Sequence, residues 1–324
     1  MAVSYLVTGA AGFIGFHLVS ELARRHGSKV YAVDNFSRGA QDEYWSILSQ
    51  NQAIEFLEID CTDRAAVEQI PTDVDYIFHL AALNGTQNFY ERPMEVIKSS
   101  TLPTIYLVEH FKNSKRLKRF VYAGTSESYA ATVTRFAWPV PTAEDVPLCI
   151  DDIRNPRWSY AASKIHGEVV TAQASTAYGM PISIIRYHNI YGPRMGDKHV
   201  IPDFYERAKK GIFELYGYED TRSFLYVDDA VHATILVSES ARTFGEVVNI
   251  GSDEEIKIHD LAKLMLRLEG IEAEIALHPS PVGSVKRRLP NTAKLMELIN
   301  FEPKTSLERG LNLTADFYLR DTLR

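Results

Sequence analysis

The chain has 324 residues, of which 45% are hydrophobic and 24% charged, a composition that excludes disordered and collagen-like proteins. Thirty-five Lys and Arg against 42 Asp and Glu give a net charge of −7 with interspersed charges, which argues against nucleic-acid binding. Cys61 and Cys149 form neither a disulfide framework nor a metal-ligand pair, so we expect a reducing compartment and no metal. We expect no secretory signal, no membrane association and a cytoplasmic location.

Short β-rich runs alternate with helical stretches through the first half of the chain. A helix is predicted from Phe13 to Arg25, and another begins near Tyr160. The predicted strands cover residues 5–7, 29–33, 54–59, 76–80, 119–123 and 182–186. This alternation predicts an α/β protein with a doubly wound parallel sheet, the Rossmann fold.

Beyond about Asn189 the alternation weakens, and Pro and Gly residues become frequent. We expect residues 1–188 to form a dinucleotide-binding domain, and 224–255 to return to it because 247–250 reads as a strand. The segments 189–223 and 256–324 are expected to form a smaller C-terminal α/β lobe that binds substrate. The Pro- and Thr-rich stretch 131–158 is predicted to be a long loop and a candidate lid.

A glycine-rich turn, Thr8-Gly9-Ala10-Ala11-Gly12-Phe13-Ile14-Gly15, follows the first strand and opens the first helix. Glycines here allow a tight turn and the close approach of a pyrophosphate to backbone N–H groups. Asp34 has the offset expected of a ribose-binding acid, which favours NAD over NADP, although the nearby Arg38 argues the other way. Asp60 and Cys61 follow the third strand, where an adenine edge can be read; a plain turn is the alternative for Asp60.

Two groups of residues suit proton transfer. Tyr160 and Lys164 are four residues apart and share one helix face, so the ammonium is expected to lower the pKa of the phenol. The alternative for this pair is an ordinary surface contact. Thr125-Ser126-Glu127 lies at the carboxyl edge of the sheet, where ligands bind. Thr125 is expected to bind a substrate hydroxyl, Ser126 to relay a proton, and Glu127 to act as general acid/base or to cap a helix.

In order and spacing these motifs resemble the extended short-chain dehydrogenase/reductase family, in its NAD-dependent epimerase/dehydratase group and nucleotide-sugar branch. The resemblance covers nearly the whole chain. It also includes His79-Leu80-Ala81-Ala82, Asn189-Ile190-Tyr191-Gly192-Pro193-Arg194, residues 222–229 and Asn249-Ile250-Gly251. The resemblance implies NAD as cofactor, a nucleotide-diphosphate sugar as substrate with UDP the expected nucleotide, transient oxidation at sugar C4, and a homodimer formed by helices near 104–111 and 160–177.

The resemblance also implies roles for individual residues. Tyr160 would be the catalytic base, Lys164 would hold the nicotinamide ribose, and Thr125 would bind the sugar. The expected cofactor contacts outside the glycine turn are Asp34, Asn35, Asp60, Cys61, Leu80, Ala81, Ala82, Tyr160 and Lys164. The expected substrate contacts are Asn84, Thr125, Asn189, Arg194, Arg222 and Arg287. The charge of Arg222 and Arg287 supports their role independently, because a guanidinium pairs bidentately with phosphate.

The step that follows C4 oxidation is left open between dehydration and decarboxylation, with 4-epimerisation as the alternative. Thr125-Ser126-Glu127 looks like the triplet of dehydratases and decarboxylases, and residues 88–93 and Arg287-Arg288-Leu289-Pro290 look decarboxylase-like. A non-catalytic NAD-binding sensor and a net oxidoreductase are further alternatives. His188 departs from the family pattern and, with His199, flanks the expected sugar pocket, so an unusual sugar is plausible.

Overall fold

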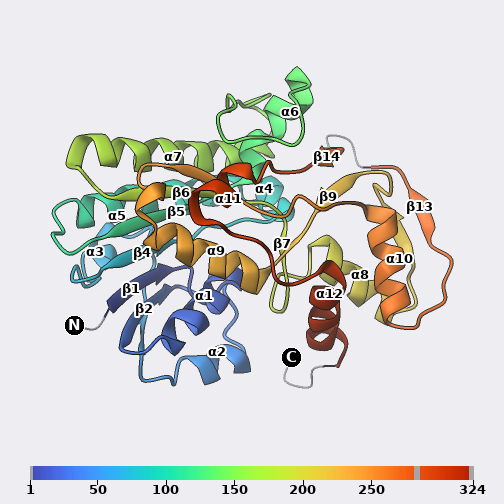
Figure 1. Cartoon of the computed structure of the whole chain (residues 1–324), viewed down its shortest axis with the longest axis horizontal. Helices are drawn as coiled ribbons and strands as arrows, with labels where there is room; N and C mark the ends of the chain where they lie inside the picture. The colour runs from blue at the N-terminus through green and yellow to red at the C-terminus, as the bar shows by residue number, and fades with distance from the viewer. Residues whose placement is uncertain (1–2, 281–284, 321–324) are drawn as a thin grey trace.

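A parallel seven-stranded sheet forms the centre of the larger lobe in the computed structural model, which describes residues 3–280 and 285–320 (Figure 1). The strand order is β3-β2-β1-β4-β5-β6-β11. The strands are β1 Val3–Thr8, β2 Ser28–Asp34, β3 Ile54–Glu58, β4 Tyr76–His79, β5 Arg119–Thr125, β6 Ile182–Tyr187 and β11 Val247–Ile250. The predicted doubly wound sheet is confirmed.

Helices cover both faces of this sheet, so its strands are hydrophobic at successive positions. Side chains alternate between the faces: Leu6 joins the cluster that contains Leu107, whereas Val7 joins the cluster that contains Val231. On one face α1 and α9 pack together, and on the other α5 packs against α7. These helices are α1 Phe13–Arg24, α5 Pro93–Phe111, α7 Trp158–Tyr178 and α9 Val227–Glu239.

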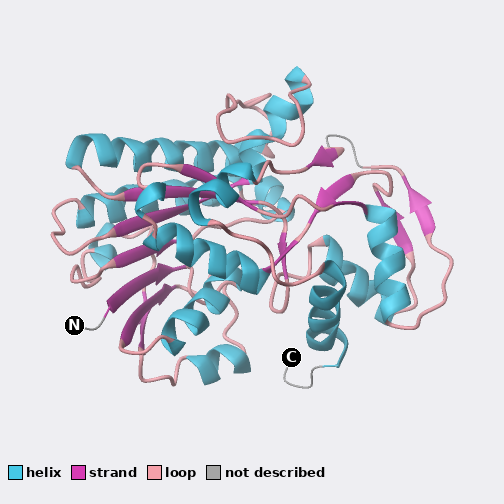
Figure 2. Cartoon of the chain, viewed as in Figure 1, coloured by secondary structure: helices cyan, strands magenta, loops and turns pink. Residues whose placement is uncertain are grey.

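The second lobe consists of short helices and three small sheets (Figure 2). Strand β7 Ile190–Tyr191 pairs with β10 Leu225–Tyr226, and β8 Glu214–Tyr216 pairs with β13 Ala276–His278. The third sheet has the order β12-β9-β14, from Glu255–Lys257, Thr221–Ser223 and Arg287–Arg288. Its helices are α8 Val200–Lys209, α10 Ile258–Leu268, α12 Leu307–Ala315 and the π-helix η3 Asp316–Arg320.

The remaining helices connect these layers. They are α2 Glu43–Leu48, α3 Arg64–Val67, α4 Thr86–Glu91, η1 Ser126–Tyr129, α6 Ala130–Phe136, η2 Ala241–Thr243 and α11 Ala293–Ile299. The prediction of a continuous loop over 131–158 is wrong at its start, because residues 130–136 form α6. Ala130 and Ala131 are buried against Trp158 and Ala161, and this apolar contact stabilises the helix.

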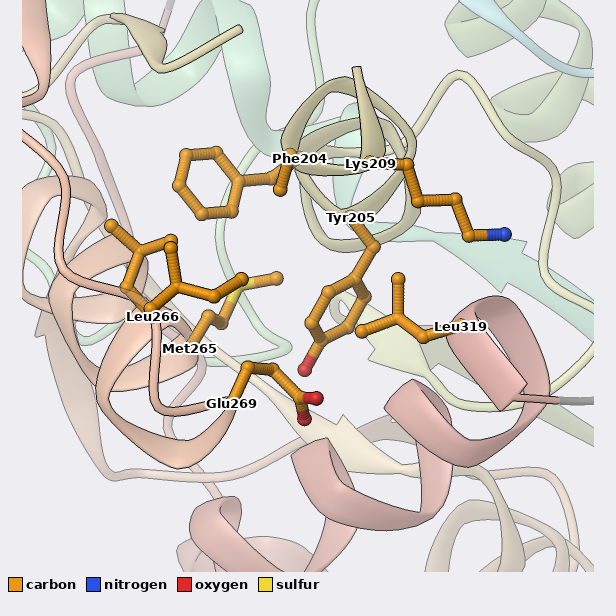
Figure 3. A pocket seen from close by; sticks show the side chains of 9 residues that line it. Phe204, Tyr205, Lys209, Met265, Leu266, Glu269 and Leu319 are labelled. Atoms are coloured by element: carbon orange, nitrogen blue, oxygen red, sulfur yellow. The ribbon is translucent and has the colours of Figure 1, made fainter. Parts of the chain in front are cut away.

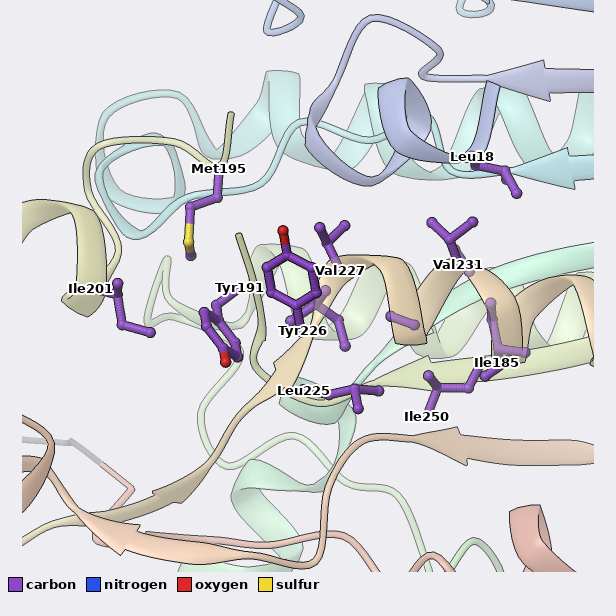
Figure 4. Close-up of a cluster of buried hydrophobic side chains, with 14 of the residues drawn as sticks. Leu18, Ile185, Tyr191, Met195, Ile201, Leu225, Tyr226, Val227, Val231 and Ile250 are labelled. Carbon is purple, nitrogen blue, oxygen red and sulfur yellow. The ribbon is translucent and has the colours of Figure 1, made fainter. Parts of the chain in front are cut away.

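A continuous apolar core joins the two lobes (Figure 4). Leu18 and Val231 lie between α1 and α9, and the same cluster extends through Tyr191 and Tyr226 to Met195. The Tyr191 and Tyr226 rings meet edge to face, with centroids 5.7 Å apart. Among the described residues, no helix is both long and apolar enough to cross a bilayer.

The sheet order reverses beside β1, because β2 lies on one side of it and β4 on the other. At the carboxyl ends of β1 and β4, the Thr8 hydroxyl contacts His79 Nδ1 at 2.8 Å, and the other ring nitrogen contacts the Thr104 hydroxyl at 3.0 Å. A sheet of this type binds its ligand in the crevice at such a switch point. The candidate site is therefore expected at the carboxyl ends of β1, β4 and β5, next to Thr8, Leu80 and Thr125.

Candidate active site

The glycine turn fits a dinucleotide pyrophosphate. Gly9 has a φ of 72°, and a Cβ on Gly15 would lie 2.0 Å from the Gly9 carbonyl oxygen, so both positions require glycine. Gly12 precedes α1 without a side-chain cap, which leaves the backbone N–H groups of the following turn for an anion. Ala81 N–H donates to the Thr8 hydroxyl at 3.3 Å and so holds residues 80–82 beside the turn.

Asp34 lies next to this turn in the position expected for a ribose-binding acid. Its carboxylate accepts hydrogen bonds from Ala11 N at 2.9 Å and Phe36 N at 2.8 Å. Burial raises the pKa of this carboxyl, and the backbone N–H groups oppose that shift. Asn35 is exposed, and its side-chain oxygen accepts from Ser37 N.

The side chains of Asp60 and Cys61, which were predicted to bind adenine, contact neighbouring residues of the protein. Asp60 is exposed, and its carboxylate accepts hydrogen bonds from both the N–H and the hydroxyl of Thr62 at 2.8 Å. This arrangement supports the alternative of a turn residue. Cys61 is buried, and burial raises the pKa of its thiol to about 12, so the side chain acts as a small apolar group.

Tyr160 lies in the first turn of α7 and is buried between aromatic and polar neighbours. The Phe89 ring on α4 stacks on the phenol ring, with centroids 5.1 Å apart and planes 11° apart. Burial raises the pKa of Tyr160 to about 12, against the positive charge of Arg38 and the polar side chains of Asn84 and Thr125, which lower it. Asn84 and Thr125 are thus both close to the reactive phenol, as their predicted roles require.

The pKa of Tyr160 is not lowered as its pairing with Lys164 predicts, although Lys164 Nζ lies 5.9 Å from the centre of the phenol ring. The same Nζ donates to the Ala123 carbonyl oxygen at 2.9 Å and lies 5.0 Å from the centre of the Tyr122 ring. Burial lowers the pKa of the ammonium to about 8. The expected lowering of the phenol pKa by Lys164 is wrong here, because desolvation dominates and Arg38 is the main opposing cation.

Glu127 lies among arginines. Its carboxylate pairs with Arg288 at 2.8 Å and with Arg157 at 3.6 Å. Burial alone would raise the pKa of Glu127, but Arg288 and Arg157, with Arg222 further away, lower it below its usual value. Burial in turn lowers the pKa of Arg222 to about 10, aided by the positive Arg288. Glu127 is therefore ionised at neutral pH, and three guanidinium groups surround one carboxylate.

Strand register decides which arginine faces this cluster. In the pair β14–β9, Arg288 is opposite Arg222 and Arg287 is opposite Thr221. Neighbouring residues of a strand face opposite sides, so Arg288 shares a face with Arg222 and Arg287 does not. Arg287 is exposed and forms a bidentate pair with Glu255, at 2.7 and 2.8 Å. The structure therefore favours Arg288 over the predicted Arg287 as a substrate contact.

Two further predicted substrate contacts have internal partners. The Arg194 guanidinium forms two hydrogen bonds with the Asp42 carboxylate, at 2.8 and 3.0 Å, and packs over the Phe16 ring. These contacts tie the residue 194 loop to α2 and argue against a phosphate role. The Asn189 amide donates to the Ser223 carbonyl oxygen at 3.0 Å and thereby positions the strand that precedes β10.

His188 is buried behind the site. Its Nε2 contacts the Asn249 side-chain oxygen at 3.1 Å, and its Nδ1 has no hydrogen-bond partner in the described residues. Burial lowers the pKa values of His188 and His79 to about 3. Both rings are neutral at physiological pH, which favours a structural role.

We expect the free energy of unfolding to fall as the pH drops from about 6.5 toward about 3. In this range the unfolded histidines bind protons that the buried His79 and His188 do not, and each contributes up to about 1.4 kcal/mol per pH unit. Urea unfolding at pH 7.5 and 5.5 measures the loss, and His79→Gln is expected to make the pH dependence shallower. Equal stability of the natural protein at both pH values would contradict this assignment.

Several site residues escaped the sequence-based prediction. Phe89 and Arg288 occur in quoted motifs but had no assigned role, and Arg157 was not singled out. Their only sequence signal is proximity to motifs: Arg157 lies three residues before Tyr160, and Arg288 adjoins Arg287. Ser126, by contrast, is where it was expected, buried in η1 between Thr125 and Glu127.

Comparisons with known proteins agree with this geometry. The model of the NAD dependent epimerase/dehydratase family matches residues 5–251. A UDP-N-acetyl-alpha-D-glucosaminuronate decarboxylase of Bacillus cytotoxicus is 34% identical, covering 97% of each chain. A UDP-glucuronate 4-epimerase of Thermodesulfobacterium geofontis is 32% identical, covering 97% of this chain and 95% of its own.

A similar crystal structure supports the same family assignment. The UDP-glucuronic acid 4-epimerase of Bacillus cereus, in complex with UDP-glucuronic acid and NAD, has a TM-score of 0.86 at 26% identity, covering 98% of this chain and 99% of that one. The predictions of an α/β fold, of NAD as cofactor and of an enzyme are confirmed. The chain belongs to the NAD-dependent epimerase/dehydratase family.

Proposed function

We propose that this protein is a decarboxylase of a UDP-linked hexuronate that works by transient oxidation at sugar C4. The observation that carries the proposal is the cluster of Arg157, Arg222 and Arg288 around Glu127, beside Thr125 and Tyr160. The three guanidinium groups face two carboxylates, those of Glu127 and of Asp220, which pairs with Arg222 at 3.7 Å. The cluster keeps a net positive charge, so it suits a ligand that brings further negative charge, as a C6 carboxylate and a diphosphate do.

Each step assigns a task to residues of this chain. Tyr160 takes the C4 hydroxyl proton, and hydride acceptance and return at C4 is the chemistry that NAD supplies when bound. The resulting 4-keto hexuronate is a β-keto acid: its C5–C6 bond breaks, CO2 leaves, and the electron pair moves to the C4 oxygen. Donors near that oxygen, from Tyr160 and Thr125, stabilise the developing negative charge before a proton is added at C5.

The ionised state of Glu127 favours decarboxylation over dehydration. Elimination of a C6 hydroxyl needs an acid to protonate the leaving oxygen, and a useful acid has a raised pKa. The arginines instead lower the pKa of Glu127. CO2 departs without a proton, so decarboxylation places no such demand on Glu127.

A hexuronate 4-epimerase is the second candidate. The same arginines suit a C6 carboxylate in either reaction, and relatives of comparable similarity include a UDP-glucuronate 4-epimerase. Turnover rates with UDP-glucuronate and with UDP-glucose test recognition of the C6 carboxylate, which both candidate functions require. We expect turnover only with the carboxylated sugar; equal rates would contradict a role for the arginine cluster in recognising C6.

Single substitutions of Arg287 and Arg288 distinguish the roles of these two neighbours on β14. Arg288→Gln is expected to lower kcat/KM for the hexuronate by about 100-fold, because a half-buried guanidinium that would pair with the substrate's negative charge is lost. Arg287→Gln is the matched control, and we expect less than about a threefold change because that side chain is exposed and pairs with Glu255. Steady-state kinetics decide, and a larger effect of Arg287→Gln would reverse the assignment.

The cellular and oligomeric predictions are separate proposals. Helices α5 and α7 pack side by side along one face of the sheet (Figure 1). We propose that this pair forms a homodimer with the same helices of a second copy, which light scattering tests. The expected cytoplasmic location is likewise a proposal.

A further inference from the structure

A cavity of about 120 Å³ lies within the second lobe (Figure 3). Helices α8 and α10 and the π-helix η3 form its walls. Phe204 and Tyr205 come from α8, Met265 and Leu266 from α10, and Leu319 from η3. None of the lining residues is among those assigned to NAD or to the sugar, so this cavity is separate from the candidate active site.

The cavity is large for a packed interior, and its lining favours an aromatic ligand. Protein cores contain few voids larger than a water molecule. An apolar cavity of roughly 150 Å³ is enough to bind benzene in another protein, so the present one has space for a single small ring. The Phe204 and Tyr205 rings and the Met265 thioether all make favourable contacts with aromatic rings.

A buried carboxylate beside this apolar space has an unused hydrogen-bond acceptor. The Glu269 side chain is 7% exposed, and its Oε2 pairs with Arg320. Its Oε1 accepts no hydrogen bond within the part of the chain that the structure describes. Burial, with the negative charge of Glu269, raises the pKa of Tyr205, and the Tyr205 hydroxyl donates to the Leu311 carbonyl oxygen instead. A ligand that donates to Oε1 would remove the penalty of an unsatisfied buried oxygen.

The third wall has an unusual backbone. The element η3, Asp316–Arg320, is a π-helix, and such turns are rare and frequently occur at functional sites. It supplies both Leu319, which lines the cavity, and Arg320, which holds the Glu269 carboxylate. The π-helix therefore places the apolar wall and the partner of the buried acid together.

The charges around the cavity argue against an anionic ligand. Arg320 pairs with Asp316 at 2.7 Å as well as with Glu269, so one cation serves two carboxylates. Lys209 also lines the cavity, but it pairs with Glu206 at 3.7 Å. These five side chains carry three negative and two positive charges, and their balance disfavours a further negative charge.

We propose that this cavity is a second ligand site, which takes one small aromatic molecule with a single O–H or N–H donor and no negative charge. The ring fills the apolar space between α8, α10 and η3, and its donor binds Glu269 Oε1. The site involves neither NAD nor the sugar, so it can be tested without turnover and stands independently of the proposed reaction.

Calorimetric titration of the purified protein with phenol, toluene and benzoate tests this site. The three probes share one ring: phenol carries a donor, toluene has a methyl group of similar size in its place, and benzoate carries a negative charge. We expect phenol to bind with a Kd of about 1 mM or lower. Toluene is expected to bind at least about tenfold more weakly, because it cannot donate to a carboxylate, and benzoate not to bind.

Two substitutions locate the binding. Ala208→Leu adds bulk to a residue that lines the cavity, and we expect it to weaken phenol by about tenfold or more. Glu269→Met removes the acceptor but keeps an apolar side chain, so phenol and toluene should then bind equally. Ala177→Leu makes the same addition at an exposed position of α7 and is the matched control, with unchanged phenol affinity expected. Unchanged NAD affinity in each variant shows that the fold is retained.

Three results would overturn the proposal. Absence of phenol binding, or unchanged phenol affinity in Ala208→Leu, would identify the cavity as a packing void only. Equal affinities of phenol and toluene for the natural protein would remove the contact with Glu269. Binding of benzoate in preference to phenol would assign the polar contact to a cation instead of the carboxylate.

Discussion

Replacing Tyr160 with Phe is expected to lower kcat by about 1,000-fold while NAD affinity changes little. The substitution removes only the hydroxyl, which exchanges the proton of the C4 oxygen. The ring remains and keeps its stacking on Phe89, so the fold should be preserved. Single-turnover kinetics and NAD titration measure the two quantities separately.

Tyr178→Phe is the matched control, because it removes a hydroxyl from the same helix at an exposed position near its C-terminal end. We expect full activity in that variant. The raised pKa of Tyr160 further predicts that kcat/KM of the natural protein rises with pH across the neutral range, since only the ionised phenol accepts the proton. Substantial activity in Tyr160→Phe would contradict its assignment as the base.

Replacing Arg186 with Met is expected to lower the free energy of unfolding by about 3–5 kcal/mol. Arg186 and Glu168 form a buried ion pair, with side chains 5% and 7% exposed and a closest distance of 2.6 Å. The substitution leaves the Glu168 carboxylate buried without its cation. Urea unfolding measures the loss, and a change below about 1 kcal/mol would contradict it.

The double variant Arg186→Met/Glu168→Leu separates the lost ion pair from lost packing. Removing both charges is expected to restore much of the stability, because no unpaired charge remains buried. Incomplete recovery is expected, since Arg186 also donates to the Tyr129 hydroxyl at 2.6 Å and the Glu144 carbonyl oxygen at 3.0 Å. A double variant less stable than Arg186→Met would show that packing, not charge, dominates.

These contacts connect stability to the site. Asn249 accepts from the Tyr129 hydroxyl at 2.8 Å and donates to the Thr142 carbonyl oxygen at 3.1 Å, while its N–H donates to the Glu144 carboxylate. The segment predicted as a lid is therefore tied to the main sheet at residues 142–144. Thr142 N–H in turn donates to Leu289 O, beside Arg288, so the same network positions the arginine cluster.

Local patterns were enough to predict the main sheet and the glycine turn. Strands buried on both faces are hydrophobic throughout, so they can be recognised from the sequence. The turn from Gly9 to Gly15 can also be recognised, because side chains at these two positions would not fit. The choice between Arg287 and Arg288 cannot be predicted from local sequence. It depends on how a two-residue strand pairs with β9, which is a tertiary contact.

The pKa shifts of Tyr160 and Glu127 could not be predicted from the sequence either. Spacing placed Lys164 on the same helix face as Tyr160, but only the structure shows its Nζ bound to the Ala123 carbonyl oxygen. Burial then raises the pKa of Tyr160, and burial follows from the packing of α4 and β5 around α7. Glu127 illustrates the reverse case, because arginines distant in sequence outweigh its desolvation.

Mass spectrometry of the product formed from NAD and a UDP-linked hexuronate, with UDP-glucuronate and UDP-N-acetylglucosaminuronate as first substrates, tests the central claim most directly. We predict a UDP-pentose product that has lost CO2, with no net accumulation of NADH. A product of unchanged mass with altered ring-proton couplings would contradict the claim and identify the protein as a 4-epimerase.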